Sequence, residues 1–175
     1  MSFSLYSKAF RNETPFLLFC EYVKNTHMKI DESSLFFSKN DQIAVVGVSQ
    51  NPKQFGRMVY NHLKKNGYNV VPVNPNTHEI NGTICYNSIS DVPNTVTKAL
   101  VITPSQNTDL VLRSIAQKGI QNVWIQNMCE SKESELIAKE LHLKYVTKKC
   151  ACMFAEPVVG IHKFHRGLLS FFGKI

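Results

Sequence analysis

Long hydrophobic runs are missing from this sequence. No apolar segment approaches the roughly 18 to 20 residues that a membrane-spanning helix needs. The longest early run, Phe16 to Cys20, is too short even for the core of a signal peptide. The five cysteines are odd in number, in a chain too long to need a disulfide framework. We therefore expect a soluble, cytoplasmic protein with reduced thiols and no transmembrane segment.

Acidic residues are also scarce. Thirteen Asp and Glu stand against 20 Lys and Arg, which gives a net charge of +7, and most of the excess lies in residues 139–175. Such a balance favours an anionic partner without identifying it. Because no RNA-binding signature, zinc finger or basic zipper is present, we expect no nucleic-acid partner.

Three regions are expected along the chain. Residues 1–30 form an N-terminal extension, residues 31–150 a nucleotide-binding domain, and residues 151–175 a C-terminal helical extension. The first eleven of residues 1–27 contain no acidic residue, as in targeting peptides. Residues 1–27 are therefore either a targeting segment or a variable extension. The helix expected from Val158 to Phe172 has an apolar stripe that would pack on the domain, join a second copy in a homo-oligomer, or lie on a membrane surface.

Short β-branched runs alternate with amphipathic helices, which predicts right-handed crossovers and an α/β fold: a doubly wound parallel sheet of about five strands in three α/β/α layers. The strands are expected at Gln42–Val46, Asn69–Val73, Ala99–Ile102, Val123–Ile125 and Lys144–Val146, with a short extra strand at Thr83–Tyr86. The helices are expected at Arg57–Lys65, from Ser105 to Lys118, and at Glu133–Leu141.

Ligands of such sheets bind beyond the carboxyl ends of the strands. The loops that matter are therefore Gly47 to Gly56, Asn74 to Asn76, Thr103 to Ser105 and Gln126 to Cys129.

The first of these loops, GVSQNPKQFG, is expected to bind a diphosphate. Gly47 allows a sharp turn off the strand, and backbone amides at the start of the helix point toward an anion. Ser49 can donate a hydrogen bond to a phosphate oxygen, while Lys53 and Arg57 can add direct charge.

A dehydrogenase would carry an acid after the second strand to hold a ribose hydroxyl. Val73, Asn74 and Pro75 stand there instead. NAD is therefore the alternative ligand and not the first choice.

Four motifs in this order, IAVVGVSQNP, GYNVVPVNP, ALVITP and NVWIQ, resemble the CoA-binding domain family over roughly residues 30 to 150. That family consists of small Rossmann-like proteins similar to the CoA-binding domain of the succinyl-CoA synthetase α subunit. The resemblance implies a Rossmann-like fold with coenzyme A or an acyl-CoA as ligand. Because none of the histidines has a recognisable nucleophile context, we expect binding without catalysis. The ligand-contacting residues predicted from the loop and the resemblance together are Gly47, Val48, Ser49, Asn51, Lys53, Gly56, Arg57, Val73, Asn74, Pro75, Thr103 and Pro104.

No catalytic or metal-binding residue is predicted. In an extended strand, Cys150 and Cys152 would point to opposite faces and stay chemically quiet. Cys129, at the ligand end of the sheet, is the best candidate for mixed-disulfide chemistry with a thiol ligand. An NAD-dependent enzyme or redox sensor, and an interaction module with an empty loop, remain as alternatives.

Overall fold

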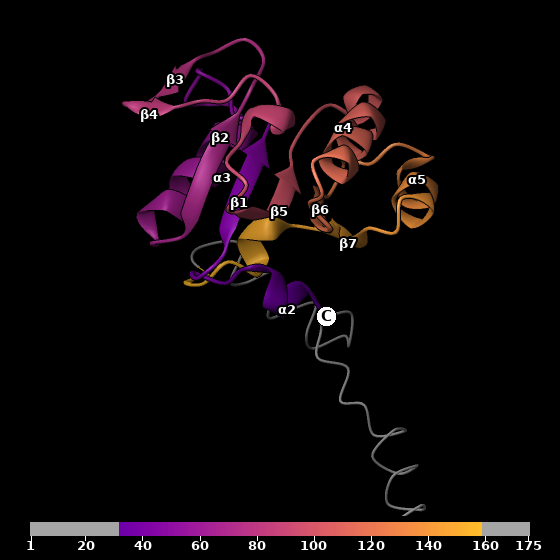
Figure 1. The fold of residues 1–175 in the computed structure, drawn as a ribbon. Helices are drawn as coiled ribbons and strands as arrows, with labels where there is room; N and C mark the ends of the chain where they lie inside the picture. The colour runs from indigo at the N-terminus through magenta and orange to yellow at the C-terminus, as the bar shows by residue number, and fades with distance from the viewer. Residues whose placement is uncertain (1–31, 159–175) are drawn as a thin grey trace, which may run out of the picture. The chain divides into compact units, whose positions relative to one another are not determined.

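Five parallel strands form the centre of the computed structural model, which describes residues 32–158 (Figure 1). Their order in space is β2-β1-β5-β6-β7. The strands are β1 (Gln42–Val46), β2 (Asn69–Val73), β5 (Val96–Val101), β6 (Asn122–Gln126) and β7 (Lys144–Lys149). The predicted five-stranded parallel sheet is therefore confirmed. The chain order reverses between β1 and β5, which makes this point the expected ligand-binding edge.

Helices cover both faces of the sheet, as predicted for a Rossmann-like α/β fold. They are α2 (Glu32–Phe36), α3 (Phe55–Lys65), α4 (Ser105–Gln117) and α5 (Ser134–Glu140), with the 3₁₀ turns η1 (Ile89–Asp91) and η2 (Ala151–Met153). Helix α3 starts two residues earlier than the sequence indicated. It ends at Lys65 and is followed by Asn66 and Gly67, whose φ of +79° suits a glycine after a helix, as expected.

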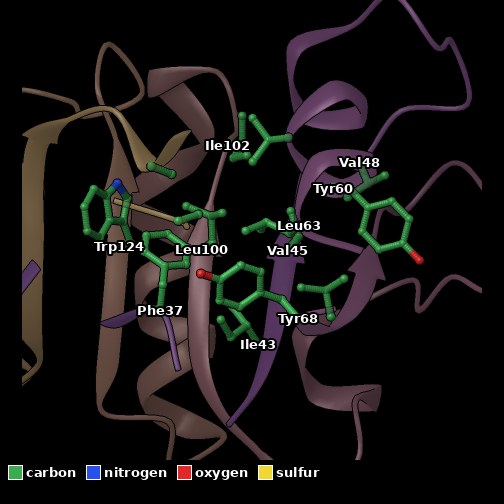
Figure 2. Close-up of a cluster of buried hydrophobic side chains, with 14 of the residues drawn as sticks. Phe37, Ile43, Val45, Val48, Tyr60, Leu63, Tyr68, Leu100, Ile102 and Trp124 are labelled. Atoms are coloured by element: carbon green, nitrogen blue, oxygen red, sulfur yellow. The ribbon is translucent and has the colours of Figure 1, made fainter. Parts of the chain in front are cut away.

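The strands are buried on both faces because their residues alternate between two cores. On one face, Ile43 and Val45 pack with Val59 and Leu63 of α3 and with Trp124. Figure 2 shows this core, in which Trp124 lies against the Phe37 ring at 5.1 Å between ring centroids. On the other face, Ala44 and Val46 of β1 pack in the core that α4 and α5 cover. A continuous apolar strand sequence follows from this two-sided burial.

A short hairpin follows β2, where the sequence indicated a loop with one strand. It consists of β3 (Glu79–Ile80) and β4 (Thr83–Ile84), joined by Asn81 and Gly82 with φ values of +50° and +71°. Asn-Gly is the preferred pair for such a turn.

The packed part of the chain continues beyond residue 150, where the sequence placed a domain boundary. Ala151, Cys152 and Ala155 are buried in the same core as Trp124. The N-terminal extension and nearly all of the predicted Val158–Phe172 helix lie outside the described residues. Within those residues, no helix is long and apolar enough to cross a membrane.

Candidate functional site

A cleft of about 840 Å³ opens at the carboxyl ends of the strands, around the point where the strand order reverses. All four loops named from the sequence contribute to it. Its volume lies within the range of pockets that hold cofactor-sized ligands, roughly 300 to 1,000 Å³. The cleft is lined by Val46, Gly47, Ser49, Gln54, Phe55, Gly56, Val73, Asn74, Pro75, Asn76, Asn87, Ser88, Ile89, Ile102, Thr103, Pro104, Asn107, Leu110, Val111, Ser114, Met128 and Cys129.

Two glycines let three backbone segments meet at the floor of the cleft. Gly47 has a φ of +99°, and a Cβ atom there would collide with the carbonyl oxygen of Ile102. A Cβ atom on Gly56 would collide with the carbonyl oxygen of Gly47. The ends of β1 and β5 and the start of α3 therefore approach as closely as backbone allows, which leaves room for a ligand directly above them.

The backbone amides of the Gly47–Gly56 loop have two different roles. Those of Gly47 and Val48 donate to the carbonyl of Val73, at 2.9 and 3.4 Å, so they tie β1 to β2 and do not face a ligand. Within the described part of the chain, no acceptor bonds the amides of Ser49, Phe55 and Gly56, three residues that line the cleft. The amides of Phe55 and Gly56 lie in the first turn of α3, where unbonded amides favour an anion, and the amide of Ser49 lies in the loop before it.

Side chains inside the loop hold its shape. The Ser49 hydroxyl accepts from the amide of Asn51 at 3.1 Å, and the Asn51 carboxamide accepts from the amide of Lys53 at 3.0 Å. Because the Ser49 hydroxyl only accepts there, its proton remains available for a ligand. Asn51 and Lys53 are exposed, and neither lines the cleft.

Arg57 was predicted to add charge to the ligand, but its guanidinium group lies beneath the loop. The residue is 6% exposed and does not line the cleft. Its guanidinium donates to the Ser49 carbonyl at 3.1 Å and to the side chains of Asn61 and Asn81. Arg57 therefore holds the loop, helix α3 and the hairpin turn together. Val48 is likewise fully buried and faces the core.

Asn74 fixes the second loop against the first. Its side-chain amide donates to the Val48 carbonyl at 2.8 Å, and its side-chain oxygen accepts from the amide of Asn76 at 2.8 Å. Since both ends of the carboxamide are engaged, Val73, Asn74 and Pro75 present a rigid, uncharged edge to the cleft.

The hydroxyl of Thr103 belongs to a chain of hydrogen bonds. Thr108 Oγ1 donates to the Cys129 carbonyl at 2.6 Å, so the 3.0 Å contact between Thr103 Oγ1 and Thr108 Oγ1 must use the proton of Thr103. Thr103 therefore offers only acceptor lone pairs to the cleft, which suit a hydroxyl or N–H of a ligand better than a phosphate.

The cysteines differ from the sequence-based prediction in one respect. Strand β7 ends at Lys149, so Cys150 and Cys152 lie on a turn and not in a strand, and the prediction of opposite faces is wrong. A hydrogen bond with Cys150, followed by burial, raises the pKa of Cys152. At Cys129, burial and the nearby Glu130 raise the pKa to about 11, which opposes mixed-disulfide chemistry.

Several lining residues were not predicted from the sequence. Residues 87–89 reach the cleft because Tyr86 forms a parallel bridge with Val73, a contact with no local sequence signal. Helix α4 contributes one face, of which Leu110 is 70% exposed. Met128 follows β6 and is 86% exposed. In the described residues that line the cleft, Asp, Glu, His, Lys and Arg are all absent. Over the same described part of the chain, no cluster of residues is suited to hold a metal ion.

The profile of a family described as CoA binding domain matches residues 41–156. An ADP-forming acetate–CoA ligase II of Archaeoglobus fulgidus is 32% identical over 146 residues, which are 81% of this chain. The matched region covers only 21% of that ligase, so this chain spans about a fifth of its length.

Solved structures are also similar to this chain, one over nearly the whole length of the solved chain and one over about a quarter of it. A conserved hypothetical protein from Pyrococcus furiosus is 31% identical with a TM-score of 0.61, and the match covers 63% of this chain and 95% of that one. The dinucleotide-forming acetyl-coenzyme A synthetase 1 of Ca. Korarchaeum cryptofilum is 26% identical with a TM-score of 0.56, over 66% of this chain and 27% of the synthetase.

Proposed function

The chain belongs to the CoA binding domain family, and from this premise we propose that it binds coenzyme A in the cleft above Gly47 and Gly56 without catalysing a reaction itself. The observation that carries the proposal is the convergence of all four strand-end loops on one cleft with a glycine floor. Its volume and its unbonded amides fit a large ligand with a diphosphate at its centre.

The diphosphate would lie over the amides of Ser49, Phe55 and Gly56, with the Ser49 hydroxyl donating to a phosphate oxygen. The adenosine would lie toward Val73, Asn74 and Pro75, because these residues form the edge next to the glycine floor on the β2 side. Thr103 would accept from a ligand hydroxyl or N–H, and Pro104 would border it. Asn51 and Arg57 would act by holding the loop in shape, and Lys53 would act only at a distance from the cleft.

Binding without catalysis is supported by the lining itself. The lining within residues 32–158 offers no side chain that titrates near neutral pH to move a proton. The Cys129 thiol, with a pKa near 11, is a poor nucleophile at neutral pH. The ligase activity of the longer relatives is not transferred, since this chain covers a fifth of the Archaeoglobus enzyme. NAD, the alternative ligand, has no support from the family match.

Titration calorimetry with coenzyme A, dephospho-CoA and NAD would test this function. We expect coenzyme A to bind and Ser49→Tyr to abolish binding, because the phenol ring would fill the space above the glycine floor. Ser49 is only half-buried, and the variant loses only the hydrogen bond from the Asn51 amide, so it should keep its circular dichroism spectrum and unfold as a single folded protein close to the wild-type midpoint. Unchanged coenzyme A affinity in a folded Ser49→Tyr protein would place the site elsewhere, and tighter binding of NAD would favour the alternative ligand.

A further inference from the structure

The side of the cleft away from β2 has an apolar part that faces solvent, while Thr103 and Asn107 supply polar groups on the same side. Met128 and Cys129 line it from the loop after β6, and Pro104 lines it from the loop after β5. Phe55, in the first turn of α3, also lines the cleft and is 39% exposed. Apolar surface of this kind is unfavourable in water unless a ligand covers it.

Both the exposure and the backbone conformation of Met128 are energetically unfavourable, and the two effects are independent. Its side chain is 86% exposed. Its backbone φ of +70° lies in the left-handed region, which disfavours residues other than glycine by about 1–2 kcal/mol. Strained residues persist at binding sites, and the flexible thioether of methionine adapts to ligands of different shape.

Glu130, the residue after Cys129, limits the charge of a group that can bind at the Met128 end of the cleft. One of its carboxyl oxygens is buried without a hydrogen-bond partner among the described residues. The charge of this carboxyl is close enough to Cys129 to contribute to the raised pKa of that thiol. Glu130 itself does not line the cleft, so its carboxyl would repel a second carboxylate at this end from behind Cys129.

We propose that the Met128 end of the cleft holds the acyl group of a coenzyme A thioester, and that it favours neutral apolar acyl groups over both free coenzyme A and acyl groups that end in a carboxylate. The inference rests on the proposed function: with the adenosine on the β2 side and the diphosphate over the glycine floor, the thiol-bearing arm extends toward Met128. The Cys129 thiol stays protonated at neutral pH, so it leaves the thioester intact.

Calorimetry with coenzyme A, butyryl-CoA and succinyl-CoA would test the proposal, since the two acyl groups have the same number of carbons. We expect butyryl-CoA to bind about tenfold more tightly than coenzyme A, which corresponds to partial burial of its alkyl chain, and succinyl-CoA to gain nothing. Met128→Ser should remove most of the butyryl preference, and Glu130→Gln should strengthen succinyl-CoA binding severalfold.

Leu136→Ser is the matched control, because Leu136 is an exposed apolar residue on α5 that does not line the cleft, and its butyryl preference should equal that of the wild type. Equal affinity of the wild type for coenzyme A and butyryl-CoA would overturn the acyl site and leave the proposed function standing. A butyryl preference that Met128→Ser retains would overturn it as well. If none of the three ligands binds, both proposals fail.

Discussion

At the scale of single residues, the site depends on side chains that are absent as much as on those present. Gly47 and Gly56 have no room for a Cβ atom, since each one would meet a backbone carbonyl. A bulky residue at Gly47 would therefore disturb the fold as well as the ligand site. Ser49 is the position at which binding and folding can be separated.

A series of glycine-to-alanine variants should rank by these contacts. Gly82→Ala meets no atom within 4 Å and has only the strain of its φ of +71°, so it should cost about 1 kcal/mol. Gly56→Ala should cost about 2–3 kcal/mol from overpacking, and Gly47→Ala, with both penalties, should cost most. Urea unfolding measures the three free energies, and a Gly47→Ala variant as stable as Gly82→Ala would contradict the ranking.

Cys129 should react with iodoacetamide far more slowly than an ordinary cysteine at pH 7.5, because its pKa is raised to about 11 by burial and by Glu130. The rate, followed by peptide mass mapping, should keep rising until about pH 11, and the urea-unfolded chain provides the unshifted control. Since the folded pKa is the higher one, the contribution of Cys129 to stability is complete below the unfolded pKa and is lost as the pH rises through 11. A reaction profile centred near pH 8.5 in the folded protein would show that the thiol is not shielded.

At the scale of structural elements, Arg57 joins three parts of the molecule. One guanidinium group bonds the Ser49 carbonyl of the ligand loop, Asn61 of α3 and Asn81 of the β3–β4 hairpin. The hairpin therefore has a structural reason to follow β2, since its turn supplies an acceptor for a buried cation.

Arg57→Met should destabilise the ligand-free protein by about 2–4 kcal/mol, because it leaves the Ser49 carbonyl and the Asn81 side chain without their donor. Lys53→Met, at an exposed position of the same loop, should change the free energy of unfolding by less than about 0.5 kcal/mol. Thermal and urea unfolding without ligand measure both effects. If Arg57 acted mainly by contacting phosphate, its replacement would leave the ligand-free stability unchanged and lower only the affinity.

At the scale of the whole molecule, the cleft lies where loops from β1, β2, β5 and β6 meet, so a ligand there contacts most of the sheet at once. Residues on both sides of the order reversal share it. Binding and global unfolding should therefore be coupled.

Coenzyme A at about 100 times its dissociation constant should raise the free energy of unfolding by about 2.7 kcal/mol and shift a single thermal transition upward by several degrees. Differential scanning calorimetry over a range of coenzyme A concentrations measures the shift. The Ser49→Tyr variant should show none. An unchanged wild-type midpoint at saturating coenzyme A would contradict binding to the folded state.

The sequence by itself determined the sheet and the position of the site. The apolar strands, the glycines that end the helices and the loop between Gly47 and Gly56 are local signals, because each depends on the preferences of neighbouring residues. Parallel topology then places the carboxyl ends of all the strands at one edge, so the four loops could be named before any contact was known.

Only the tertiary structure decided what each side chain does there. Arg57 turned inward because carbonyl and amide acceptors from distant segments surround it. The Gly47 and Val48 amides bond the carbonyl of Val73 in the neighbouring strand. Met128 was brought to the cleft by the end of β6. Such partners lie far apart in sequence, and hydrogen-bond competition among them is settled only when the strands pack together.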